Sequence, residues 1–107
     1  MGVGIDIVAI KHIKNYKTLA KKILSEKEYE IFLTKQSEEN AINFVAGRYA
    51  AKEAFLKANK VGIGAINFQA ISIINLNSGQ PILYYQEKEY EVSISHEKEY
   101  AIAIVIL

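Results

Sequence analysis

The sequence predicts an α+β fold, in which a mainly antiparallel sheet packs around a long central helix in a single compact domain, residues 1–107. Three observations predict this class. A strand-like segment opens the chain, helical patterns fill its middle, and four segments rich in isoleucine, valine and tyrosine close it. Because the helices are grouped, they do not supply the crossovers that a parallel sheet requires. No internal repeat or glycine- and proline-rich linker divides the chain.

The first predicted element is a strand over residues 2–10, where apolar side chains alternate with other residues. One face carries Val3, Ile5, Ile7 and Ala9. Asp6, on the other face, is the only charged residue of the strand.

Residues 19–35 follow a helical pattern with a break near residue 25. The break is indicated by Ser25 and Glu28, because this spacing forms a capping box that satisfies free backbone N–H groups at a helix start.

The central helix begins after Ser37, where a hydroxyl cap precedes acidic residues, and we expect it to end near Asn59. Over residues 44–58 nearly the whole circumference is apolar or small, which indicates a helix enclosed by its neighbours. Glu53 lies opposite Phe44, beside alanines that leave room for a ligand. An ordinary ion pair between Glu53 and Lys57 explains the same spacing, and the helical pattern alone slightly favours it.

The remaining strands are predicted over residues 66–75, 81–85, 89–95 and 100–107. Turn-like stretches separate them, and the clearest is Asn77-Ser-Gly-Gln-Pro81.

Composition limits the kinds of functional site that the chain can form. The chain has 107 residues, is 50% hydrophobic and contains no cysteine, which excludes disulfides, thiolate zinc sites and a cysteine nucleophile. No apolar run is long enough to span a bilayer, and no basic region precedes the first apolar stretch. We therefore expect a cytoplasmic protein without membrane insertion.

Asp6 and Glu53 are candidate ligands for Mg²⁺, which binds few protein carboxylates and fills its other positions with water and phosphate oxygens. The alternative for Asp6 is a turn cap at the end of the strand. Ser93, Ser95 and His96 form a third candidate site at a strand end. Their alternative, which the residues alone favour, is a turn histidine with serines facing solvent.

A basic stretch lies between residues 7 and 25, which contain no acidic residue although the net charge is only +1. Its cations are Lys11, His12, Lys14, Lys17, Lys21 and Lys22. An acidic partner, a nucleic acid or a solvated helix face each explain it. Nucleic acid ranks lower, because the whole chain is almost neutral and only Tyr16 interleaves the cations.

Several motifs occur in order along nearly the whole chain: GIDIV, LSEKE, FVAGRYAAKEAFLKA, GIG at 62–64, NSGQP, and VSISH followed by EYAIAIV. In this combination the sequence resembles the holo-acyl-carrier-protein synthases, the short-chain phosphopantetheinyl transferases. The resemblance implies Mg²⁺-dependent transfer of the 4′-phosphopantetheine arm of coenzyme A to a serine of apo acyl carrier protein, with release of adenosine 3′,5′-bisphosphate.

The resemblance also assigns residues. The metal-binding acids of the family match Asp6 and Glu53, and Lys57 joins them as a catalytic residue. The residues that match the coenzyme A site are Arg48, Lys57, Gly64, Pro81, Ser93 and His96. The sequence does not choose among Glu53, a metal-bound water and another carboxylate as acceptor of the serine proton.

Partners follow from the same resemblance. An acidic acyl carrier protein would dock near Lys11, His12, Lys14 and Lys17, and the chain would form a homotrimer whose active sites are shared between neighbours. We expect neither a nucleic acid nor a membrane as partner. The competing functions are a noncatalytic module that binds coenzyme A or carrier protein, and another Mg²⁺-dependent enzyme acting on nucleotide phosphates.

Overall fold

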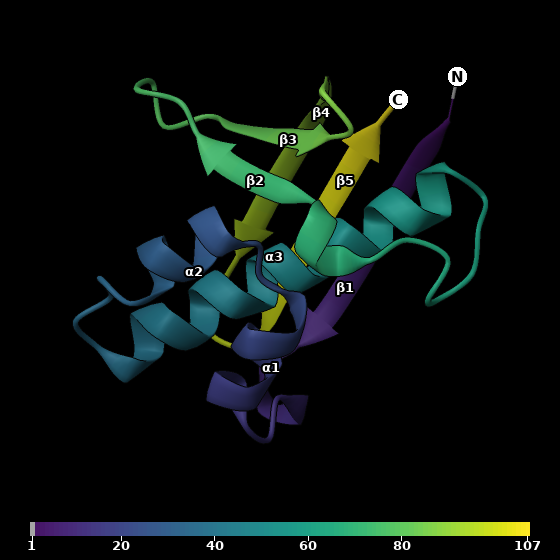
Figure 1. Ribbon diagram of the computed structural model, residues 1–107. Helices are drawn as coiled ribbons and strands as arrows, with labels where there is room; N and C mark the ends of the chain where they lie inside the picture. Colours follow the sequence, from purple (N-terminus) through teal and green to yellow (C-terminus); the bar gives the residue numbers. More distant parts are fainter. Residues whose placement is uncertain (1) are drawn as a thin grey trace.

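Five antiparallel strands and three α-helices form the computed structural model, which describes residues 2–107 (Figure 1). In chain order the elements are β1 (Val3–Ala9), the 3₁₀ turn η1 (Ile10–His12), α1 (Tyr16–Ile23), α2 (Glu26–Phe32), α3 (Glu38–Ala58), the 3₁₀ turn η2 (Phe68–Ala70), β2 (Ser72–Asn75), β3 (Pro81–Tyr85), β4 (Lys88–His96) and β5 (Tyr100–Ile106). The predicted α+β class, with its long central helix and antiparallel sheet, is confirmed.

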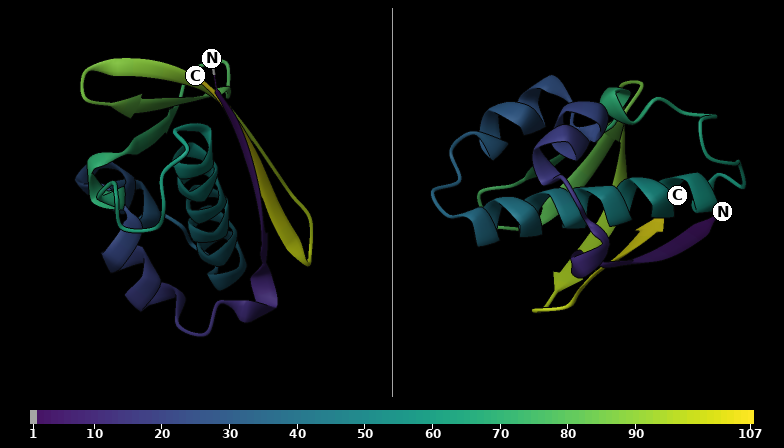
Figure 2. Two further views of the ribbon diagram at one scale, coloured as in Figure 1. Left: turned by 90° about the vertical axis from the view of Figure 1, so that its right-hand side faces the viewer. Right: turned by 90° about the horizontal axis from the view of Figure 1, so that it is seen from below.

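The strands form one sheet in the order β1-β5-β4-β3-β2, so β1 and β2 are its two edges. The sheet bends around α3, and α1 and α2 cover the side of this helix away from β1 and β5 (Figure 2). Consequently α3 is surrounded on nearly every side, as its apolar circumference predicts.

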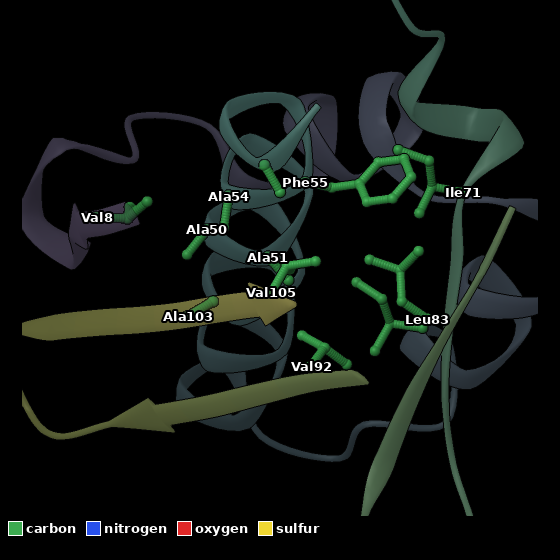
Figure 3. Close-up of a cluster of buried hydrophobic side chains, with 12 residues drawn as sticks. Val8, Ala50, Ala51, Ala54, Phe55, Ile71, Leu83, Val92, Ala103 and Val105 are labelled. Atoms are coloured by element: carbon green, nitrogen blue, oxygen red, sulfur yellow. The ribbon is translucent and has the colours of Figure 1, made fainter. Parts of the chain in front are cut away.

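The core forms where α3 meets the sheet. Ala51 and Phe55 of α3 belong to one buried cluster with Leu83, Val92 and Val105 from three different strands (Figure 3). Small residues on α3 let the strands approach the helix closely, and Phe55 fills the remaining space beneath β3 and β4.

Both predicted helix starts are confirmed. Ser25 and Glu28 exchange hydrogen bonds in a capping box at α2, with Ser25 N donating to Glu28 Oε1 at 2.9 Å. The Ser37 hydroxyl accepts from Asn40 N at 3.0 Å, and α3 ends at Ala58, just before Asn59. The helical region before residue 25 begins earlier than residue 19, because Asn15 accepts a hydrogen bond from Thr18 N and caps α1.

The strand expected over residues 66–75 is correct only in its second half. Its first half contains η2, because the Asn67 side chain accepts from Gln69 N and starts a turn there. The carbonyls of Phe68 and Ile71 also turn towards the Lys52 ammonium group instead of a neighbouring strand. These local and tertiary hydrogen bonds outweigh the apolar pattern.

The outer face of β1 and β5 is apolar and exposed. Val3, Ile5 and Ile7 are 63%, 55% and 59% exposed, and they pair across the strands with Ile106, Ile104 and Ile102. The opposite face of both strands packs on α3. Both faces of these two strands are therefore apolar, but within a single chain only the face that packs on α3 is covered.

Within residues 2–107, none of the helices combines the length and apolar character needed to cross a membrane.

Candidate active site

Gly4 sets the distance between β1 and α3. A Cβ atom at this position would lie 1.9 Å from the Ala54 carbonyl oxygen and 2.6 Å from Ala58 N, which no side chain can occupy. The missing side chain therefore allows the strand to lie directly on the helix backbone. Asp6 lies two residues further along the same face of β1. The close contact of strand and helix therefore also brings Asp6 near the turn of α3 that contains Glu53.

Asp6 and Glu53 lie near enough in the folded chain for the Asp6 charge to act on the Glu53 carboxyl. Burial raises the pKa of the Glu53 carboxyl, and the neighbouring Asp6 carboxylate raises it further. Lys57 and the Tyr49 hydroxyl act in the opposite direction on this pKa. Two carboxylates that repel each other in a partly enclosed place form a site that a cation stabilises.

Lys57 contacts Asp6 from one turn further along α3 than Glu53. Its Nζ donates to Asp6 Oδ1 at 3.0 Å and to the Ile5 carbonyl at 3.1 Å. The ordinary pair expected between Glu53 and Lys57 is thus replaced by an ion pair across two elements. Asp6 lies in the middle of β1 and does not cap a turn at the strand end.

The donor set fits a hard cation with few protein ligands. Among the described residues, histidine, cysteine, aspartate and glutamate nowhere gather in a group of three or more that could hold a metal ion. Asp6 and Glu53 supply two carboxylates, and this number suits Mg²⁺, which retains water and phosphate oxygens as its other ligands.

A second group of sequence-predicted residues surrounds a cavity of about 300 Å³ on the other side of α3. Arg48, Pro81 and His96 line it together, beside Asn75 and Phe44. Arg48 Nη2 donates to Asn75 Oδ1 at 2.8 Å and to the Ile73 carbonyl at 3.1 Å. The guanidinium carbon also lies 4.2 Å from the centre of the Phe44 ring. This cavity therefore has a positive charge fixed in its wall.

Arg48 is held more deeply than a freely moving surface arginine. Its side chain is 11% exposed, and its Nε, 4.0 Å from Glu28 Oε2, is buried without a hydrogen-bond partner. Burial lowers the pKa of the guanidinium from its ordinary value, and Glu28 partly offsets this effect.

One chain does not bring all the predicted site residues together. Lys57 contacts β1 and Arg48 contacts β2, which are the two opposite edges of the sheet. Ser93 is exposed on β4 and, with Pro81, lines a separate hollow of about 260 Å³. Gly64 lies in the exposed loop after α3 with a φ of 89°, a conformation that favours glycine.

Sequence reasoning missed a buried ion pair between Glu28 and Lys52, both of which have 0% exposure. Lys52 Nζ donates to Glu28 and to the carbonyls of Ile23, Phe68 and Ile71, so it joins α1, α2 and η2 to α3. A sequence signal exists, because Lys52 shares the apolar stripe of α3 with Val45 and Leu56. A lysine on such a stripe needs buried acceptors.

Two of the predicted docking residues, His12 and Lys14, line a groove of about 420 Å³ between η1, α1 and α3. Its walls include His12, Lys14 and Lys22, and Tyr49 of α3 closes one side. Lys17 lies outside this wall, with its Nζ 6.0 Å from the centre of the Tyr16 ring.

Comparison with protein families places this geometry in a known group. Residues 2–105 match the model of the 4′-phosphopantetheinyl transferase superfamily. A holo-[acyl-carrier-protein] synthase of Geobacillus sp. (strain WCH70) is 44% identical over 115 residues, covering 100% of this chain and 95% of the relative. The corresponding enzyme of Staphylococcus saprophyticus is 40% identical over 111 residues, covering 99% of this chain and 96% of the relative.

Solved structures agree with the sequence relatives. The crystal structure of a holo-(acyl-carrier-protein) synthase from Bacillus anthracis str. Ames in complex with CoA (3′,5′-ADP) has a TM-score of 0.88 and 40% identity, covering 97% of this chain and 92% of that chain. The Helicobacter pylori synthase in complex with coenzyme A has a TM-score of 0.79 and 31% identity, covering 97% of both chains. The chain therefore belongs to the 4′-phosphopantetheinyl transferase superfamily, among its holo-[acyl-carrier-protein] synthases.

Proposed function

We propose that this chain transfers the 4′-phosphopantetheine arm of coenzyme A to a serine of apo acyl carrier protein and releases adenosine 3′,5′-bisphosphate. The observation that carries the proposal is the meeting of Asp6 and Glu53 beside Lys57, in a chain similar to these synthases over nearly its whole length. The nucleophile is the serine of the carrier, so the chain itself needs none.

Asp6 and Glu53 would hold Mg²⁺ against the diphosphate of coenzyme A. When bound, the cation would supply Lewis-acid stabilisation of the negative charge on the phosphate oxygens and the leaving group. Lys57, which donates to Asp6 and to the Ile5 carbonyl, would supply a second positive charge at this site. The Lys57 side chain is 56% exposed, so a phosphate could reach it.

Arg48, His96 and Pro81 would bind the nucleotide part of coenzyme A from a neighbouring subunit. This assignment is supported by their position at the opposite side of α3 from Lys57, which prevents one chain from enclosing a ligand with both groups. Ser93 and Gly64 would line the same shared site. The fixed orientation of Arg48 favours recognition of a phosphate over loose attraction.

A homotrimer would supply that neighbouring subunit. It is supported by the apolar outer face of β1 and β5, whose six residues are all more than a third exposed in the single chain. They are Val3, Ile5, Ile7, Ile102, Ile104 and Ile106. Burial of this face between copies removes apolar surface from water and places the edge of one chain's sheet beside another chain.

The acyl carrier protein would dock near Lys11, His12, Lys14 and Lys17, of which His12 and Lys14 line the basic groove. Opposite charges increase the rate of encounter, and salt weakens this attraction without changing the transfer chemistry. Tyr49 lines this groove and precedes Glu53 by one turn of α3, so a carrier docked there would present its serine near the acid pair. A cytoplasmic location stays a prediction.

The test is incubation with coenzyme A, Mg²⁺ and a panel of apo carrier proteins, followed by intact-mass measurement of the carrier. We expect the carrier to gain the mass of the arm. We also expect Asp6→Ala and Glu53→Ala to lose at least about a hundredfold in rate while remaining folded. Bound coenzyme A without any mass gain would instead identify a noncatalytic module, and turnover of another nucleotide would identify a different phosphate enzyme.

A further inference from the structure

Glu28 is a fully buried carboxylate whose two oxygens have different partners. Its Oε1 accepts hydrogen bonds from Lys52 Nζ and from Ser25 N, whereas its Oε2 accepts one from Ile73 N at 2.8 Å. Oε2 also lies 4.0 Å from Arg48 Nε. One carboxylate therefore interacts with two cations of α3 that are one helical turn apart.

Ile73 connects Glu28 with Arg48. It lies in the edge strand β2, and its N–H and C=O groups both form hydrogen bonds outside the sheet. The N–H donates to Glu28 Oε2, and the carbonyl accepts from Arg48 Nη2 at 3.1 Å. Arg48 Nη2 also donates to Asn75 Oδ1 at 2.8 Å, so both of its N–H bonds are directed at β2. The carboxylate and β2 together fix the guanidinium group.

The charges of this cluster do not cancel. One carboxylate faces two cations, and the Lys52 ammonium group already contacts its Oε1, so Arg48 carries the uncompensated positive charge. Both hydrogen bonds that Arg48 donates within residues 2–107 come from Nη2, which leaves Nη1 for a ligand. Arg48 lines the cavity of about 300 Å³ with Lys35 and His96, and none of the described residues in this lining is acidic. An anion in the cavity would therefore meet a cation whose own carboxylate is buried behind it.

We propose that Glu28 is a positioning residue for nucleotide binding, because its carboxylate holds Ile73 and Arg48 in place and so aims the guanidinium group at a phosphate in the cavity. The inference rests on the proposed function, which assigns recognition of coenzyme A to Arg48. A guanidinium group recognises phosphate through the directions of its N–H bonds, so its orientation matters as well as its charge. Glu28 itself touches no part of the ligand.

The test compares Glu28→Gln with the wild-type protein in direct binding of adenosine 3′,5′-bisphosphate, measured by isothermal titration calorimetry. Glutamine keeps the size of the side chain and one acceptor oxygen, but it loses the charge and places an N–H donor where an oxygen accepted. We expect about tenfold weaker binding, which corresponds to the loss of one hydrogen bond to a charged group. In transfer assays the KM for coenzyme A should rise by a similar factor, with kcat changed much less.

A double-mutant cycle separates positioning from a merely structural effect. Arg48→Ala should weaken nucleotide binding strongly, and adding Glu28→Gln to it should cause little further loss, because Glu28 acts through Arg48. Ser25→Ala is the matched control, since it removes the hydroxyl of the same helix cap and leaves the contacts of Arg48 intact. This control should unfold at a lower temperature but bind the nucleotide like the wild type.

A second variant decides the question if Glu28→Gln does not fold. The double substitution Glu28→Met with Lys52→Met removes the buried ion pair as a unit, which proteins tolerate better than the loss of one partner. It also leaves Arg48 without its carboxylate, so it should show the same loss of nucleotide affinity.

Wild-type affinity of Glu28→Gln or of the double variant, beside weak binding by Arg48→Ala, would overturn the role of Glu28 and leave the proposed function intact. An undiminished loss on adding Glu28→Gln to Arg48→Ala would also overturn it, because the effect would then not pass through Arg48. Wild-type binding by Arg48→Ala, or no binding by the wild-type protein, would overturn the assignment of Arg48 and the inference with it.

Discussion

Replacement of Gly4 by alanine tests whether the close contact of β1 with α3 creates the active site. The added Cβ would lie 1.9 Å from the Ala54 carbonyl oxygen, whereas Cβ contacts essentially never fall below 3.0 Å. The strand must therefore move by about 1.1 Å, because the Ala54 oxygen and the Ala58 nitrogen that the new Cβ would meet are backbone atoms and cannot rotate away. This displacement would carry Asp6 away from Glu53 and Lys57.

Two effects are expected. The free energy of unfolding should fall by about 1–3 kcal/mol, the usual cost of overpacking. Transfer should fall about a hundredfold, because a misplacement near 1 Å can have that effect on positioned groups. Urea unfolding and the intact-mass assay measure the two quantities on the same preparation.

Gly62→Ala is the control, because nothing lies within 4 Å of a Cβ at that position. It should change neither quantity by much. A Gly4→Ala protein with wild-type stability and wild-type turnover would refute the reasoning, since it would mean that the strand can move without disturbing the acids.

Three further predictions follow from packing, charge and exposure. Lys52→Met should lower the free energy of unfolding by about 3–5 kcal/mol at pH 7, because it leaves Glu28 buried without its cation. Burial lowers the pKa of Lys52 from 10.5 to about 8 in the folded chain. Between these two pH values the unfolded chain binds more protons than the folded chain, so the contribution of Lys52 to the free energy of unfolding should rise with pH, by about 1–3 kcal/mol. Gln86→Asn with Glu87→Gly should stabilise the β3–β4 turn by about 1 kcal/mol, because both residues have positive φ, 49° and 64°. Ile104→Asp should convert the proposed trimer into monomers in analytical ultracentrifugation, because it places a charge in the apolar face.

Each of these predictions has a contradicting result. Urea titrations of wild type and Lys52→Met whose difference stays flat from pH 8 to 10 would contradict the effect of burial on the pKa. The turn variant would fail by unfolding at a lower temperature than the wild type. Ile63→Asp serves as control for assembly, because Ile63 is 86% exposed in a loop, and equal sedimentation of both aspartate variants would argue against the apolar face as the contact.

The elements could largely be predicted from the sequence, because their signals are local. Ser25 with Glu28 and Ser37 with the acids after it mark helix starts through hydrogen bonds within one turn. The C-terminal half of the predicted strand 66–75 and the other three strands followed from their residue types. The first half failed because Asn67 starts a turn and Lys52, far away in the chain, binds the carbonyls of this segment.

The candidate site, like the fold, could be predicted only in part from the sequence. Residue types drew attention to Asp6 and Glu53, and the family resemblance added Lys57, so these three residues remain the predicted site. Only the tertiary structure decided that Lys57 pairs with Asp6 and that Arg48 is fixed against β2 on the opposite side of α3. The physical reason is that these relations depend on how closely a strand lies on a helix, which is a property of both surfaces together. The sequence by itself determined the fold class, the helix starts and the chemical character of the site, whereas packing determined which charges meet.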